Sequence, residues 1–333
     1  MSVLYVSPTG QDSHEGTGKF PFKTITHALT QARPGDIVQL ASSTYQAEEK
    51  FPLVVPDGVT VAGTTAASVI VRGGGSYQLA GAPAGDSVNV TSVNGTSVNV
   101  TMVLGDRAQI REVTVTNPQG SGLLSIAGAA LIIRNRLVQS QQHGALIAGI
   151  AHPFISQNEF IENGATGLTL RSQAKGEIRQ NRFQQTGTGI SLFDQSAPLI
   201  VDNQLTENHT GVLVAHSARP VFRQNQLLAN QEIGLWTKDR AQPDIGQPQD
   251  LGANHFEGKT YDICNDAASP VVTAGNQLNP IRTKGAIAYL PSEIPDDAAV
   301  PAVLLGTVEP LPELRIRPMR RVPLRPLAPT CPA

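Results

Sequence analysis

Apolar and polar residues alternate in a unit that recurs along residues 134–278. Each unit opens with an asparagine followed two residues later by a large apolar residue. The pairs are Asn135/Leu137, Asn158/Phe160, Asn181/Phe183, Asn203/Leu205, Asn225/Leu227, Asn254/Phe256 and Asn276/Leu278. Successive asparagines lie 22 or 23 residues apart, except for a gap of 29 residues before Asn254. A constant period of this length indicates a solenoid.

Within a unit, three short apolar-alternating segments are separated by turn residues, which leaves no room for a helix. Equivalent segments of successive units are expected to pair in parallel, about 4.8 Å apart. Strand-crossover-strand connections are almost always right-handed. The pattern therefore predicts an all-β, right-handed parallel β-helix with three short strands per coil.

Stacking of equivalent positions predicts ladders of identical or similar side chains. The asparagines should form one ladder at a turn, with each amide bonding the neighbouring coils. Three apolar ladders should fill the interior. They are Leu137/Phe160/Phe183/Leu205/Leu227, Leu168/Ile190/Val212/Leu235 and Ile155/Ile178/Ile200/Phe222/Ile245/Val272.

The first 63 residues have a different pattern, which predicts a cap followed by the first coils. Between Thr24 and Ala32, apolar residues fall on one helical face, and Pro34 follows. An amphipathic helix over the open end of a solenoid shields unpaired strand edges. We therefore expect an N-terminal capping helix.

Two further departures define the remaining domain boundaries. Asn94-Gly95 lies between two alternating runs, which predicts a hairpin insertion near residues 87–103 within a body spanning 64–290. A second insertion is expected as an outward loop around Gly246 to Gly252. Residues 291–333 are rich in proline and arginine, a composition that predicts disorder.

The N-terminal segments resemble a known domain family. The matching strings are Tyr5-Val-Ser-Pro-Thr-Gly10, Pro21-Phe-Lys-Thr-Ile25, Pro34-Gly-Asp36 and Pro56-Asp-Gly-Val-Thr-Val-Ala-Gly63. They look like the uncharacterised domain that opens many bacterial pectin-lyase-like β-helix proteins. The resemblance implies the β-helix fold. Relatives on this fold include polysaccharide lyases, hydrolases and epimerases, which is an analogy of fold alone.

Composition narrows the functional classes. The formal net charge of −2 gives no electrostatic footprint for nucleic acid. No apolar run is long enough for a membrane helix, and the N-terminus lacks the features of a signal peptide. These observations predict a cytoplasmic protein that binds neither nucleic acid nor membrane. The two cysteines, Cys264 and Cys331, have no metal-site spacing.

One turn column carries the best candidate chemistry. Four successive units each contain a glycine at the equivalent position: Gly167, Gly189, Gly211 and Gly234. The fifth residues after these glycines are Ser172, Asp194, His216 and Asp239, which should stack in that order. Two carboxylates flanking an imidazole could perform general acid and base catalysis on a glycan. The same column is a solvent-facing turn, where Asp, His and Ser are ordinary residues.

Neighbouring positions could bind the substrate. Arg171 and Lys238 precede two members of the column and could clamp an anionic sugar. Trp236 should point outward and could stack on a sugar ring.

No cofactor or metal is predicted, because the remaining histidines lie in different registers and the acidic residues form no cluster. The glycines at 73–75 open no helix, which argues against a phosphate cradle.

Three functional hypotheses remain. The first is a non-catalytic solenoid that binds an extended ligand, best matched by a carbohydrate polymer, or a protein partner. The second is a polysaccharide-processing enzyme that uses Asp194, His216 and Asp239. The third is an assembly scaffold that acts through residues 291–333.

Overall fold

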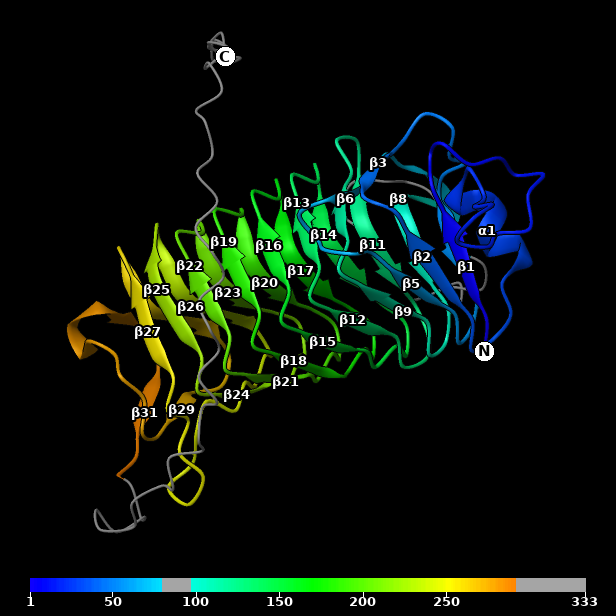
Figure 1. Cartoon of the computed structure of the whole chain (residues 1–333). Coiled ribbons are helices and arrows are strands. Elements are labelled where there is room, and N and C mark those ends of the chain that lie inside the picture. Colours follow the sequence, from blue (N-terminus) through cyan, green and yellow to red (C-terminus); the bar gives the residue numbers. More distant parts are fainter. Residues whose placement is uncertain (80–96, 292–333) are drawn as a thin grey trace, which may run out of the picture. The chain divides into compact units, whose positions relative to one another are not determined.

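The computed structural model describes residues 1–79 and 97–291, and these form a parallel β-solenoid of about ten coils (Figure 1). Each regular coil contributes one strand to each of three sheets. The predicted hairpin turn at Asn94-Gly95 and the segment from residue 292 onward lie outside the described residues.

We name the sheets A, B and C. Sheet A contains β1 (Val3–Val6), β2 (Ile37–Leu40), β5 (Thr60–Ala62), β9 (Gln109–Arg111), β12 (Leu131–Ile133), β15 (Phe154–Ser156), β18 (Glu177–Arg179), β21 (Leu199–Val201) and β24 (Val221–Arg223). Sheet B contains β3 (Ser43–Tyr45), β6 (Val69–Arg72), β10 (Thr114–Thr116), β13 (Arg136–Val138), β16 (Glu159–Ile161), β19 (Arg182–Gln184), β22 (Gln204–Thr206), β25 (Gln226–Asn230) and β27 (His255–Gly258).

Sheet C has the longest strands. It contains β4 (Leu53–Val55), β7 (Gly75–Gln78), β8 (Ser97–Leu104), β11 (Ser121–Ser125), β14 (His143–Ile147), β17 (Thr166–Leu170), β20 (Thr188–Leu192), β23 (Thr210–Val214), β26 (Ile233–Asp239), β28 (Tyr261–Ala267) and β30 (Thr283–Lys284). Strand β7 pairs antiparallel with β8, whereas the other pairs of this sheet are parallel. A short helix, η1 (Pro280–Arg282), and the pair β29 (Val271–Thr273) and β31 (Ile287–Tyr289) follow.

The apolar ladders fill the interior in the predicted register. Leu137 pairs with Phe160, Phe160 with Phe183, and Phe183 with Leu205, and all four are fully buried. The rings of Phe160 and Phe183 stack with centroids 4.5 Å apart. The ladder that begins at Ile155 was predicted wrongly at its last member, Val272. Val271 faces the core instead, and Val272 is only half-buried.

The asparagine ladder runs from Asn135 to Asn276 as predicted. The backbone N–H of Asn158 donates to Oδ1 of Asn181 at 2.9 Å, and its Nδ2 donates to the same oxygen at 3.0 Å. Nδ2 of Asn181 in turn donates to the carbonyl of Ile155 at 2.9 Å. The side chains replace hydrogen bonds that the turning backbone cannot make for itself, so the buried polar groups are satisfied.

The predicted capping helix is α1 (Ile25–Gln31), and it buries Ile25, Ala28 and Leu29. The Thr24 side chain accepts from the N–H of His27, as is usual for an N-cap residue. The carboxylate of Glu49 accepts from the N–H groups of Ile25 and Thr26, both at 2.8 Å. A distant coil thus supplies the negative charge that the first turn of this helix favours.

Candidate functional site

The predicted column follows the strands of sheet C at their C-terminal ends. Ser172, Asp194, His216 and Asp239 occupy equivalent positions after β17, β20, β23 and at the end of β26. Each has a left-handed backbone, with φ values between 57° and 60°. Asp, Asn and His adopt this conformation more readily than most residues. Backbone geometry therefore accounts for much of the residue choice in this column.

The carboxylates of the column bond backbone groups of the preceding coil. Oδ2 of Asp194 accepts from the N–H of Ser172 at 2.9 Å, and Oδ2 of Asp239 accepts from the N–H of His216 at 2.9 Å. Like the asparagine ladder at another corner, these side chains accept backbone N–H groups of the preceding coil and so link the two coils. The column is thus a structural ladder, whatever chemistry it also performs.

His216 and Asp194 form the closest side-chain pair in the column. Nδ1 of His216 lies 2.8 Å from Oδ1 of Asp194 and 3.2 Å from the backbone nitrogen of Asp194. One nitrogen cannot serve as donor and acceptor at once, and the shorter contact to a carboxylate favours a proton on Nδ1. In that tautomer Nε2 carries the lone pair, and the side chain is 49% exposed.

Arg171 lies beside this pair but is buried. Its Nε is 3.5 Å from Oδ2 of Asp194, and its guanidinium lies 5.2 Å from the centroid of the Phe193 ring. Only 7% of the residue is exposed. The guanidinium therefore stabilises the column from within and is not positioned to clamp a substrate in this conformation.

Trp236 and Lys238 lie next to each other on β26. Nε1 of Trp236 donates to Oδ2 of Asp266 at 2.9 Å, while Nζ of Lys238 lies 4.4 Å from the indole centroid. This hydrogen bond, followed by the one from Lys284, lowers the pKa of Asp266. The indole is thus held at a fixed orientation by a carboxylate on the next strand and a cation on its own strand.

Two other groups in this sheet have shifted pKa values. His143 is the outward residue at the start of β14, and its Nδ1 lies 3.2 Å from Oγ1 of Thr169. Burial, together with the nearby charge of Arg171, lowers the pKa of His143 to about 4. Cys264 on β28 is buried, and burial raises the pKa of its thiol to about 11.

The outer face of sheet C divides into a covered and an accessible part. Outward residues of the earlier strands are buried, with exposures of 2% for Thr169 and 3% for Ser191. On the last strands several outward residues are accessible, although Cys264, which pairs with Trp236, is buried. We call the accessible set the C-terminal patch: Leu213, His216, Trp236, Lys238, Asp239, Tyr261 and Asp266.

Sequence reasoning placed His216, Trp236, Lys238 and Asp239 in this patch but missed Tyr261 and Asp266. Both lie on β28, beyond the long gap between Asn225 and Asn254. The insertion in that gap breaks the spacing from which the earlier positions were counted. Arg223, at the end of β24, binds Asp244 at 3.0 Å and Asp250 at 2.6 Å, so the loop is tied to the solenoid.

Over residues 1–79 and 97–291, no group of three or more His, Cys, Asp or Glu side chains could hold a metal ion. No helix within the same ranges is long and apolar enough to cross a membrane.

Fold and ladders together define a right-handed parallel β-helix of the pectate-lyase-like class. Residues 8–283 match one family model, so the chain belongs to the family described as "Protein of unknown function (DUF1565)". A segment of 42 residues is 48% identical to the uncharacterized protein YwoF of Bacillus subtilis strain 168. That segment spans 13% of this chain and 9% of the relative.

Solved structures resemble the chain over most of its length. Pectate lyase Pel9A matches with a TM-score of 0.56 and 14% identity, over 88% of this chain and 78% of that protein. An alginate lyase from Paenibacillus sp. str. FPU-7 matches with a TM-score of 0.52 and 13% identity, over 87% and 99%. XylC in complex with xylose matches with a TM-score of 0.51 and 11% identity, over 83% and 69%. At these identities the likeness establishes the fold.

Proposed function

We propose that this protein binds a carbohydrate polymer without cleaving it, and that the C-terminal patch is the binding site. The observation that carries the proposal is the orientation of Trp236, which is fixed by Asp266 and Lys238 on an accessible part of the sheet. Sugar recognition commonly combines an aromatic ring with polar groups that accept and donate hydrogen bonds. Tyr261 adds a second aromatic ring on the strand next to Trp236.

The charges of the patch favour a neutral polymer. Lys284 lies 3.0 Å from Oδ1 of Asp266, and Arg171 is buried against Asp194. Lys238 and Asp239 are adjacent in sequence and opposite in charge. A polymer with one negative charge on every residue would therefore meet little net attraction.

The fold is consistent with an extended ligand. The patch lies on three neighbouring strands, β23, β26 and β28, so a ligand that extends across the coils could contact all of them. The solved structures with this fold include a pectate lyase and an alginate lyase, whose names state that they act on polysaccharides.

Catalysis is the second candidate, and one observation favours it. The Nδ1 contact with Asp194 leaves Nε2 of His216 with no hydrogen-bond partner among the described residues. A histidine oriented by a carboxylate in this way could act as a general base. Against catalysis by the column, one oxygen of each carboxylate, Oδ2 of Asp194 and Oδ2 of Asp239, already accepts a backbone N–H within the ladder.

Trp236 is the only tryptophan of the chain, so its fluorescence reports directly on the patch. We expect a panel of neutral polysaccharides to include one that changes this emission in a saturable manner. In a pull-down, that polymer should retain the wild-type protein but not the Trp236→Ala variant. The matched control is Phe20→Ala, because Phe20 is an accessible aromatic residue outside the patch and also has a lysine, Lys19, above its ring.

A reducing-end assay on the same polymers separates binding from turnover. The comparison is between wild type and the triple variant Asp194→Asn/His216→Ala/Asp239→Asn, with circular dichroism to show that both are folded. Product release by wild type alone would replace the binding proposal with an enzymatic one. Unchanged binding by Trp236→Ala would remove the patch from the proposal.

A further inference from the structure

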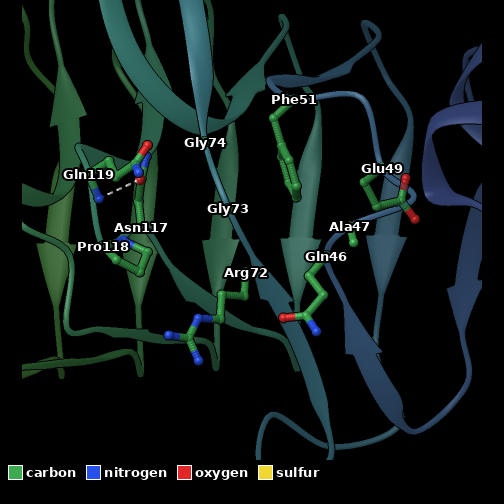
Figure 2. A pocket seen from close by; sticks show the side chains of 10 residues that line it. All are labelled: Gln46, Ala47, Glu49, Phe51, Arg72, Gly73, Gly74, Asn117, Pro118 and Gln119. Atoms are coloured by element: carbon green, nitrogen blue, oxygen red, sulfur yellow. Dashed lines mark hydrogen bonds between the residues drawn. The ribbon is translucent and has the colours of Figure 1, made fainter.

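A concave site lies among the N-terminal coils, separate from the C-terminal patch. It has a volume of about 420 Å³ and is formed where three segments meet (Figure 2). The segments are residues 46–51 after β3, residues 72–74 at the end of β6 and just beyond it, and residues 117–119 after β10. A volume of this size accommodates a small organic molecule.

Two glycines allow the wall to form. A Cβ on Gly73, which has a φ of +148°, would lie 2.4 Å from Cε2 of Phe51. A Cβ on Gly74 would lie 2.3 Å from Nδ2 of Asn117. Bare backbone at these positions lets the phenylalanine ring and the asparagine amide approach closely. These close contacts give the run of glycines a role that its sequence context did not reveal.

Asn117 fixes the opposite wall. It is fully buried, and its Nδ2 donates to Oδ1 of Asn99 at 3.0 Å and to the carbonyl of Ser121 at 2.8 Å. Its Oδ1 accepts from the N–H of Gln119 at 3.1 Å. Pro118 and Gln119 are therefore held in place at the rim before any ligand binds, which lowers the ordering entropy lost on binding.

The Glu49 carboxylate, the negative charge in the pocket lining, is already hydrogen-bonded to α1. Both oxygens of Glu49 accept hydrogen bonds from the first turn of α1, and Oε2 also accepts from Oγ1 of Thr26 at 2.7 Å. Figure 2 shows Glu49 and Arg72 on opposite sides of the pocket. A ligand with one anionic end would therefore be oriented by this pair, with its negative group toward Arg72.

The remaining polar groups are available for a ligand. Arg72 is exposed, and within the described ranges its guanidinium has no ion-pair or hydrogen-bond partner. The same holds, over those ranges, for the side-chain amides of Gln46 and Gln119. Phe51 is half-buried and contributes an apolar surface to the pocket lining (Figure 2).

We propose that this pocket binds an acidic sugar residue, with its carboxylate on Arg72, its hydroxyls on Gln46 and Gln119, and its apolar ring face on Phe51. An arginine pairs with a carboxylate through a planar fork, and amide side chains both donate to and accept from hydroxyls. The inference is independent of the C-terminal patch, where the charges are balanced and a neutral polymer fits.

The test uses three probes and calorimetric titration of the full chain. Galacturonate should bind saturably, galactose should bind at least tenfold more weakly because it lacks the carboxylate, and inorganic phosphate should not compete at equal concentration. Arg72→Gln should weaken galacturonate binding at least tenfold. Arg219→Gln is the control, since Arg219 is also exposed but lies outside the pocket lining.

Gln119→Ala provides a second variant that leaves the glycine packing intact and should weaken both sugars to a similar extent. Trp236 emission should stay constant during these titrations, which separates this site from the patch. Equal affinity for galactose and galacturonate, unchanged affinity in Arg72→Gln, full competition by phosphate, or no saturable binding at all would each overturn the proposal.

Discussion

Arg171 and Asp194 form an ion pair between neighbouring coils that is shielded from solvent on the arginine side. Nε of Arg171 lies 3.5 Å from Oδ2 of Asp194, which is an ion-pair distance. The Nε–H group makes no hydrogen bond within the described residues. The Phe193 ring covers the guanidinium. Removal of one partner from such a pair leaves an uncompensated charge, which is more damaging than replacement of both.

The first prediction is a double-mutant cycle on this pair. Asp194→Asn should lower the free energy of unfolding by about 2–4 kcal/mol, because Arg171 stays buried and charged. Arg171→Met should cost less, because the Asp194 side chain is 29% exposed and keeps its hydrogen bonds with Ser172 and His216. The double variant should be more stable than Asp194→Asn alone. Urea unfolding measures all four proteins. Additive losses would show that the two residues do not interact.

The second prediction concerns the left-handed corner at His216, where φ is 58°. His216→Asn should fold with near wild-type stability, because asparagine adopts this conformation readily. His216→Val should be less stable by about 1–2 kcal/mol, because a β-branched side chain is strained there. Thermal unfolding of the two variants checks the difference, and a valine variant as stable as the asparagine variant would contradict it.

The third prediction concerns the asparagine ladder. Asn181→Ala removes the acceptor of Asn158 and leaves buried donors without partners. We expect a loss of about 2–4 kcal/mol in the free energy of unfolding. Gln173→Ala in the same coil is the matched control, because its side chain is exposed, and it should change stability by less than about 0.5 kcal/mol. Similar losses in both variants would argue against a special role for the ladder.

The fourth prediction is a pH dependence caused by His143. Its pKa is about 4 in the folded protein, below the ordinary value of 6.5. The unfolded chain therefore binds a proton first, and stability falls as the pH decreases from 6.5 to about 4, by an amount on the order of 3 kcal/mol.

His143→Thr is the comparison for this pH series, because Thr166, Thr188 and Thr210 occupy the equivalent positions of the next coils. Urea unfolding at several pH values should show a shallower decline for this variant. Parallel curves for the two proteins would mean that His143 does not titrate in this way.

The fifth prediction concerns the reactivity of Cys264. Its buried thiol has a pKa of about 11, so the thiolate is scarce at neutral pH. In a Cys331→Ser variant, labelling of Cys264 by iodoacetamide at pH 8 should be slow in the native protein and fast in urea. Rapid native labelling would show that this part of sheet C opens readily.

The sequence by itself determined the fold, because a solenoid repeats one local pattern. The spacing of Asn135, Asn158 and Asn181 fixes the coil length, and each apolar residue that stacks on its equivalent fixes the strand register. These are local rules repeated many times, so a single departure such as Val272 changes little.

The tertiary structure alone decided which candidate residues share an accessible surface. Counting along the chain brought Asp194, His216 and Asp239 into one column. It could not show that the two aspartate carboxylates bond backbone groups of the neighbouring coil. It also could not place Asp266 beside Trp236 across an irregular insertion, or bring Phe51, Arg72 and Asn117 together around one pocket. Hydrogen-bond partners, burial and concavity depend on side chains from different coils meeting in space, which no spacing within the chain specifies.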